Sequence, residues 1–146
     1  MNFVLVTGGT KKQRKLVEGI VKWCIKELMP RYRTLEIEVC LRDTLKEGAY
    51  GWCEQVDKRN FRVDIHKKEA EFFKGKEDQI KTIIHEMVHV WQYSSGIAQQ
   101  RADGKMMWKK KDYTDTPYSK QPWERQAHRM EEKLFQKWLT EVVEQV

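Results

Sequence analysis

Apolar residues recur at helical spacing in three stretches of the chain. The first runs from Lys11 to Met29 and is closed by Pro30. The second runs from Glu77 to Ser95, and the next residue is Gly96, a residue type common just after a helix. The third opens at Pro122 and continues to about Glu144. Each stretch places its apolar residues three or four positions apart, so we predict three amphipathic helices.

A period of two marks the strands. From Thr34 to Arg42, apolar side chains alternate with charged ones, as in a strand with one buried face. The stretch "GWCEQVDKRNFRVDIHK", Gly51 to Lys67, predicts two more strands around a polar turn, and Asn2 to Thr7 allows a short strand at the start. Short connections between three consecutive strands favour an antiparallel meander. The predicted fold class is therefore α+β, with an N-terminal helix, a three-stranded, mostly antiparallel sheet and two later helices.

The size and composition are those of one ordinary globular domain. The chain has 146 residues, of which 40% are hydrophobic and 34% charged, so we expect a single domain over 1–146. It has no run of 18 apolar residues and no signal-peptide pattern at its start, which predicts a cytoplasmic protein. The three cysteines are widely spaced and form no Cys-x-x-Cys pair, which argues against a disulfide framework or a thiolate zinc site.

The net charge of +6 permits contact with nucleic acid, but the lysines are scattered. The densest cluster, Lys105 to Tyr113, mixes basic and aromatic residues, as phosphate-backbone binding surfaces do. The alternative is an ordinary solvated loop. This cluster lies in a polar stretch, Ile97 to Gln121, that has no clear periodicity. A stretch of that length in a compact domain is usually functional or contains a short regular element.

The second predicted helix carries the sequence "HEMVH", with His85 and His89 one turn apart and Glu86 beside the first. Two neutral imidazoles at this spacing can bind one zinc ion from the same helix face. A glutamate on the adjoining flank can take a proton from the water that the ion acidifies. The other face of the helix is apolar, which indicates a buried helix rather than a solvated one. We therefore predict a catalytic metal site.

A third ligand must come from downstream. The three-histidine extension of this motif would need Gly at position 92 and His at position 95, where the chain has Gln92 and Ser95. We favour Glu124, because it lies in the first turn of the helix opened by Pro122, and we keep His128, one turn on, as a partner of a ligand or an alternative ligand. The full set of downstream candidates is Asp103, Asp112, Asp115, Glu124, His128 and Glu131.

The stretch "HEMVHVWQ" and the later "PWERQAH" resemble the gluzincins, zincin metallopeptidases whose third ligand is a glutamate, in a minimal single-domain form. They are also similar to small SprT-like and phage-encoded metallopeptidases. The resemblance implies a zincin fold in which His85, His89 and Glu124 bind zinc and Glu86 is the general base. Gluzincins often have aspartate where this chain has His128, and SprT-like proteases use a third histidine, which keeps His128 as an alternative ligand.

The resemblance also implies a place for the substrate. In the family, the strand before the metal-binding helix usually pairs with an extended peptide, and here that strand is Phe61 to Lys67. Candidates to stabilise the oxyanion are Tyr113 and Tyr118, with Arg101 behind them, although each can be an ordinary loop residue. The expected function is that of a zinc-dependent endopeptidase.

A different class of function stays open. The chain can instead be a catalytically inactive, zinc-containing module that binds nucleic acid or a protein partner. A purely structural zinc site has no use for a general base, so Glu86 favours the peptidase.

Overall fold

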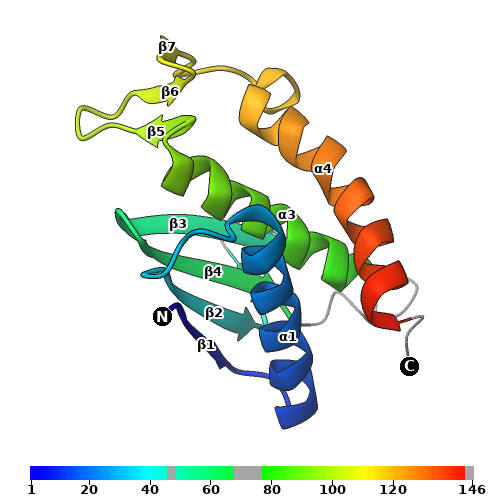
Figure 1. Ribbon diagram of the computed structural model, residues 1–146. Helices are drawn as coiled ribbons and strands as arrows, with labels where there is room; N and C mark the ends of the chain where they lie inside the picture. Colours follow the sequence, from blue (N-terminus) through cyan, green and yellow to red (C-terminus); the bar gives the residue numbers. More distant parts are fainter. Residues whose placement is uncertain (46–48, 68–76, 144–146) are drawn as a thin grey trace.

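The computed structural model describes residues 1–45, 49–67 and 77–143. Its main sheet consists of β1 (Phe3–Thr7), β2 (Glu36–Arg42), β3 (Gly51–Asp57) and β4 (Asn60–His66). These strands lie in the order β1-β2-β4-β3 (Figure 1). β2 is parallel to both β1 and β4, and only β3 is antiparallel to its neighbour. The coarse α+β prediction is confirmed, with four strands in place of three.

The predicted antiparallel meander is wrong. β4 inserts between β2 and β3, and the first strand of the chain pairs in parallel with β2 across a helical crossover. In this central position, the apolar side chains of Phe61, Val63 and Ile65 all belong to the buried core. In β3, Trp52 and Val56 are exposed, as suits a strand at the edge of a sheet.

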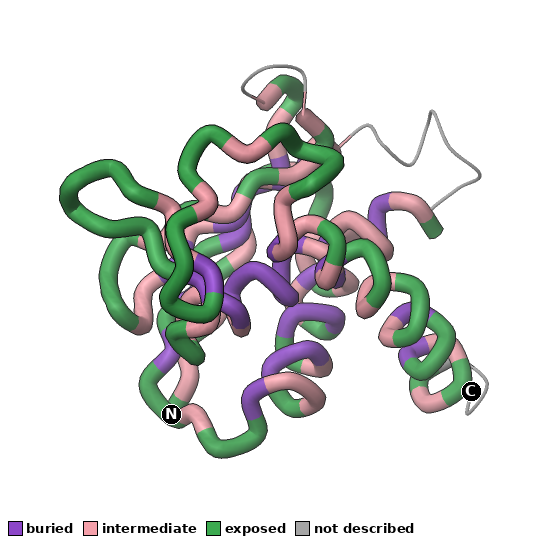
Figure 2. The backbone as a smooth tube through the Cα atoms, turned by 90° about the horizontal axis from the view of Figure 1, so that it is seen from above, coloured by how far each residue is buried: buried purple, intermediate pink, exposed green. Residues whose placement is uncertain are grey.

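Helices α1 (Lys11–Leu28) and α3 (Glu77–Ser95) cover one face of this sheet (Figure 1). α1 begins with a capping box, in which Thr10 and Gln13 each bond the other's backbone N–H. The apolar stripes of both helices meet the inward side chains of the strands in one core cluster. Figure 2 shows these buried residues at the centre of the molecule, with exposed ones around them.

The third predicted helix corresponds to α4 (Pro122–Trp138), which packs along α3 on the side away from the sheet (Figure 1). A π-helical turn, η3 (Leu139–Val143), continues it, and the predicted end at Glu144 lies outside the described residues. α3 is therefore enclosed between the sheet and α4. None of the helices in the described part of the chain has the length and apolar character that crossing a bilayer requires.

The polar stretch between α3 and α4 folds into a small antiparallel sheet of β5 (Ala98–Gln100), β6 (Met106–Trp108) and β7 (Lys111–Asp112), followed by a 3-10 turn, η2 (Tyr118–Lys120). Ala98 and Trp108 pack on Trp123 of α4 in a second, smaller apolar cluster. The basic stretch Lys105 to Tyr113 forms a hairpin whose turn residues Lys109 and Lys110 have positive φ and are exposed. Its contact with nucleic acid stays a prediction.

Candidate metal centre

Two histidines of α3 and one glutamate of α4 converge on a single point. The Nε2 atoms of His85 and His89 lie 2.8 and 3.2 Å from Oε1 of Glu124. One ligand atom from each of the three residues fits within a 4.8 Å span, which is compact enough to hold one metal ion. Two imidazole nitrogens and one carboxylate oxygen are the donor types of a catalytic zinc site.

The start of α4 is held tightly against α3. Pro122 occupies the first turn, where its fixed φ suits a helix start, and Trp123 and Ala127 are buried. Because Ala127 carries only a methyl group, the two helices can approach closely at this level. This packing places Glu124, in the first turn of α4, opposite the two histidines of α3.

The hydrogen bonds of His85 indicate that a positive charge is needed between this histidine and Glu124. Nδ1 of His85 lies 2.9 Å from Oε1 of Glu131, and because a carboxylate only accepts, Nδ1 carries the proton. The opposite nitrogen, Nε2, faces Glu124, which also offers only lone pairs. Two acceptors at 2.8 Å repel each other unless a proton or a metal cation lies between them.

The pKa shifts of His85 and Glu124 both favour the charged form of the side chain. Burial lowers the pKa of His85, but its hydrogen bonds to Glu124 and Glu131 outweigh this and raise it to about 10. Burial raises the pKa of Glu124, but its hydrogen bonds to His85 and His89 hold that pKa well below the usual range. The metal-free cluster therefore keeps Glu124 ionised and stores positive charge on the histidines. A divalent cation would take the place of those protons.

Glu86 differs from the other carboxylates of the site. Its side chain is 5% exposed, and its Oε2 atom is buried with no hydrogen-bond partner among the described residues. Burial raises the pKa of this carboxyl, although His89 and His85 oppose the shift. A buried acceptor without a protein partner is rare, and it is typical of a group that accepts a hydrogen bond from a bound water or ligand. This is the position expected of a base beside a metal.

Gly51, the first residue of β3, sets how close this strand comes to Glu86. A Cβ atom at Gly51 would lie 2.7 Å from Cγ2 of Thr82, which would have to shift, and 3.1 Å from Cγ of Glu86, which is a tight contact. Glycine permits this approach of the strand to α3 without displacing either side chain. The start of β3 therefore runs directly beside Glu86.

Tyr118 and His128 form the exposed side of the site. The hydroxyl of Tyr118 lies 3.3 Å from Oε1 of Glu124 and 3.0 Å from Nε2 of His128. Burial, followed by the charge of Glu124, raises the pKa of Tyr118 to about 12, so its hydroxyl stays protonated at neutral pH. His128 forms a second potential ligand group with His85 and Glu131.

The other sequence candidates lie elsewhere. The ring of Tyr113 packs edge-on against Trp123 and belongs to the smaller apolar cluster. Arg101 pairs with Asp103 beside the small sheet, and Asp112 accepts hydrogen bonds from Thr114. The structure thus brings Tyr118, and not Tyr113, to Glu124 and His128.

The predicted substrate strand, Phe61 to Lys67, is also wrong. Within it, β4 pairs with β2 on one side and β3 on the other, so it has no free edge for a peptide. The edge beside the site belongs to β3 instead. The alternation of apolar and polar residues in this strand shows that one face is buried, but it does not show that both edges are paired.

The sequence alone does not reveal the roles of Gly51, Glu131 and Gln92 in the site. The sequence indicates Glu131 only as a candidate ligand, whereas in the structure it bonds Nδ1 of His85. The sequence shows Gln92 only as a departure from the three-histidine pattern, whereas in the structure it bonds Nδ1 of His89 at 2.8 Å. The i, i+3 spacing of His89 and Gln92 on a helix is a signal that could have revealed this contact.

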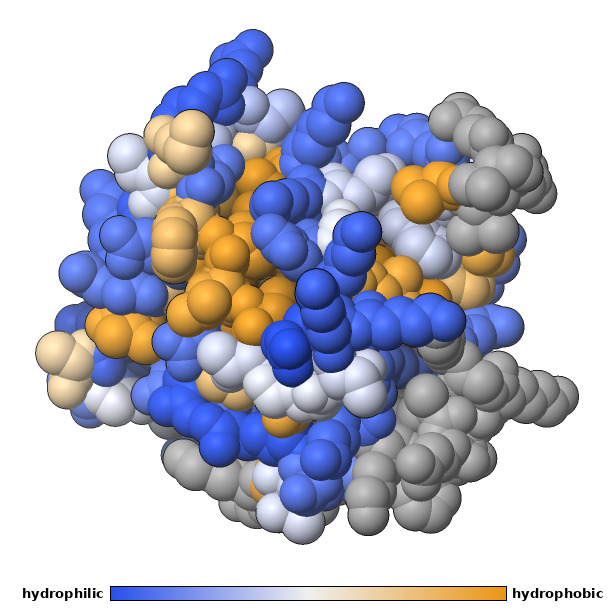
Figure 3. All heavy atoms as spheres, turned by 90° about the horizontal axis from the view of Figure 1, so that it is seen from below, coloured by the Kyte–Doolittle hydropathy of each residue, from blue (hydrophilic) through white to orange (hydrophobic). Residues whose placement is uncertain are grey.

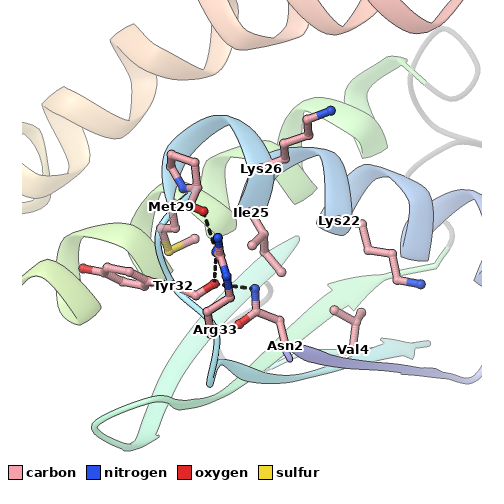
Figure 4. Close-up of a pocket in the computed structure, with 9 residues that line it drawn as sticks. Asn2, Val4, Lys22, Ile25, Lys26, Met29, Tyr32 and Arg33 are labelled. Atoms are coloured by element: carbon pink, nitrogen blue, oxygen red, sulfur yellow. Dashed lines mark hydrogen bonds between the residues drawn. The ribbon is translucent and has the colours of Figure 1, made fainter.

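A separate hollow of about 470 Å³ lies between α1 and β1, with Ile25 facing Val4 and the amide of Asn2 bonded to the carbonyl of Tyr32 (Figure 4). None of its lining residues belongs to the histidine cluster. Seen from below, the molecule exposes apolar surface broken by long polar side chains (Figure 3). The candidate metal centre therefore shares no residue with this hollow.

The chain matches no protein-family model, and no curated protein and no solved structure is significantly similar to it.

Proposed function

We propose that the protein is a zinc-dependent metallopeptidase of the gluzincin type, with His85, His89 and Glu124 as its ligands. The observation that carries the proposal is the convergence of two imidazole nitrogens on Glu124, next to the buried and unpartnered carboxylate of Glu86. Glu124 is favoured over His128 because its carboxylate contacts both His85 and His89, whereas His128 is exposed and its ring packs on that of His85.

Each residue has a distinct part in the reaction. A zinc ion, when bound, supplies Lewis acidity that lowers the pKa of water and polarises a carbonyl. Glu86 accepts the proton of the attacking water and later delivers it to the leaving amine. The protonated hydroxyl of Tyr118 can donate a hydrogen bond to the oxyanion that develops on the carbonyl. Its exposure leaves it accessible to a substrate.

The free edge of β3 supports an extended peptide as the substrate. The carbonyl of Tyr50 accepts from the N–H of His66, so this residue directs its backbone groups towards β4. In an antiparallel ladder the direction alternates, so Gly51, Cys53 and Gln55 direct theirs away from β4. Among the described strands β3 pairs only with β4, which leaves these groups available to a peptide.

The test replaces Glu86 by glutamine, which preserves size and removes the charge. Glu86→Gln should keep zinc and fold while losing roughly 100-fold or more in rate, because the base is gone. Activity would be measured as release of fluorescent peptides from heavily labelled casein, with chelated wild type as the blank. Glu36→Gln is the matched control, since Glu36 lies on β2, outside the proposed substrate edge, and is exposed. Full activity in Glu86→Gln would refute the mechanism.

The part of Tyr118 is tested by removing its hydroxyl. Tyr118→Phe should lower kcat by roughly 100-fold, the scale of one lost oxyanion donor, with little change in zinc content. Tyr113→Phe is the matched control in the same polar stretch, and it should keep wild-type kcat. Equal effects of the two variants would show that Tyr118 has no special part in the reaction.

A further inference from the structure

The side chain of Gln92 links a histidine of α3 to the start of α4. It is fully buried, and its amide oxygen lies 2.8 Å from Nδ1 of His89. Its amide nitrogen lies 3.0 Å from the backbone carbonyl oxygen of Trp123 and 2.8 Å from Oε1 of Gln126. One side chain therefore contacts a metal-ligand candidate and the residue that precedes Glu124.

The orientation of this amide follows from its fixed partner. The carbonyl of Trp123 can only accept, so the atom of Gln92 that faces it must be the NH2 group. The reversed amide would bring two acceptors together at 3.0 Å and leave a buried donor facing His89. The amide oxygen of Gln92 therefore faces His89 and accepts the proton of Nδ1. In the neutral form of His89, the lone pair is then on Nε2, the nitrogen that faces Glu124.

We infer that Gln92 is a positioning residue that holds the proton of His89 on Nδ1 and fixes the start of α4, so that Nε2 and Glu124 face one point. This link between α3 and α4 matters because the proposed ligands belong to both helices, and a shift of one helix would separate the ligands. The consequence for zinc binding rests on the proposed function. The place of the proton does not, because the hydrogen bond from Nδ1 is present with or without a metal.

The first experiment compares two buried glutamines of α3. Gln79 is 2% exposed, and its amide nitrogen contacts the backbone carbonyls of His66 and Lys67, away from the histidine cluster. Gln92→Met should weaken zinc binding about 10- to 100-fold, the range for residues that orient a ligand. Gln79→Met should keep wild-type affinity, although both variants lose a buried hydrogen-bonding group. Affinity would be measured by competition with a chromophoric chelator on protein shown to be folded by circular dichroism.

The second experiment observes the proton directly by nitrogen-15 NMR of histidine-labelled protein. Wild type and Gln79→Met should show a slowly exchanging proton on Nδ1 of His89, and Gln92→Met should lose it. Gln92→Glu separates the two parts: its carboxylate still accepts from Nδ1, but when ionised it cannot donate to Trp123. This variant should keep the slow proton and still bind zinc more weakly.

Two results would overturn the inference: a wild-type His89 with no slowly exchanging proton on Nδ1, or a folded Gln92→Met with wild-type zinc affinity. A wild-type protein that binds no zinc would instead refute the proposed function, and the NMR result would still decide where the proton lies.

Discussion

Two neighbouring glutamates of α4 contact α3 at the same distance but in different surroundings. Glu131 lies 2.9 Å from Nδ1 of His85, and Glu132 lies 2.9 Å from Nζ of Lys81, one turn earlier on α3. The side chain of Glu131 is 22% exposed and that of Glu132 is 57% exposed. The α3–α4 interface therefore has an inner region around the histidines and an outer region around Lys81.

The two regions differ in whether a permanent positive charge is paired with their carboxylates. Lys81 carries a permanent positive charge, and its hydrogen bond holds the pKa of Glu132 below the usual range. In the inner region, Glu86, Glu124 and Glu131 surround two imidazoles that are charged only when protonated. An ion pair at a surface contributes little to the stability of the fold, and its carboxylate already has a cationic partner. Around the two imidazoles, a metal cation could replace the protons that balance these buried and half-buried carboxylates, which is why we place the proposed metal site in the inner region.

The largest effect should follow from removing the carboxylate that both histidines face. Glu124→Ala should lower zinc affinity by more than about 100-fold, beyond the range of residues that only orient a ligand. Glu132→Ala, in the outer region of the same helix, should keep wild-type affinity. Both would be measured by competition with a chromophoric chelator. If His128→Ala weakened zinc binding more than Glu124→Ala, the third ligand would be His128 and the assignment would change.

A smaller effect should separate the two neighbouring glutamates. Glu131→Gln removes the charge that orients His85, so zinc affinity should fall about 10- to 100-fold. Glu132→Gln removes a charge of the same sign one residue away and should leave the affinity unchanged. Metal titration of both variants checks this. Equal losses would mean that the net charge of α4, and not the contact with His85, controls binding.

The smallest effect is a pH dependence confined to the inner region. In the metal-free chain the pKa of His85 is raised from 6.5 to about 10, so at neutral pH this imidazole holds a proton that zinc must displace. Zinc affinity should therefore rise with pH, by about tenfold per unit for each proton released, until pH exceeds that pKa. Calorimetry in buffers of different ionisation enthalpy would count the protons. An affinity independent of pH between about 7 and 9 would contradict this charge assignment.

The helices were predictable because their apolar spacing is strong and local. The bounds of α3 were predicted correctly, as was the meeting of His85, His89 and Glu124, since each depends on a helix face and on one close helix pair. The strand order was not predictable in the same way, because alternation shows which face is buried but not which strand is the neighbour. The insertion of β4 between β2 and β3 is a long-range choice.

The contacts that complete the site are also long-range. Glu131 contacts His85, and Gln92 contacts Trp123. Both contacts depend on the position along α3 at which α4 packs. The clearance at Gly51 depends on β3 lying at the sheet edge beside α3. A sequence shows these residues as a surface acid, a polar helix residue and a strand glycine. Their roles in the site become clear only when the neighbouring helix or strand is in position.

The central claim is tested most directly by the metal content of the folded protein. Protein purified without chelator and analysed by inductively coupled plasma mass spectrometry should contain about one zinc ion per chain, the stoichiometry of a three-ligand site. His89→Ala prepared in parallel should contain almost none, because one of the two imidazoles is removed. Folded wild type that carries no metal, and takes up none when zinc is added, would contradict the account.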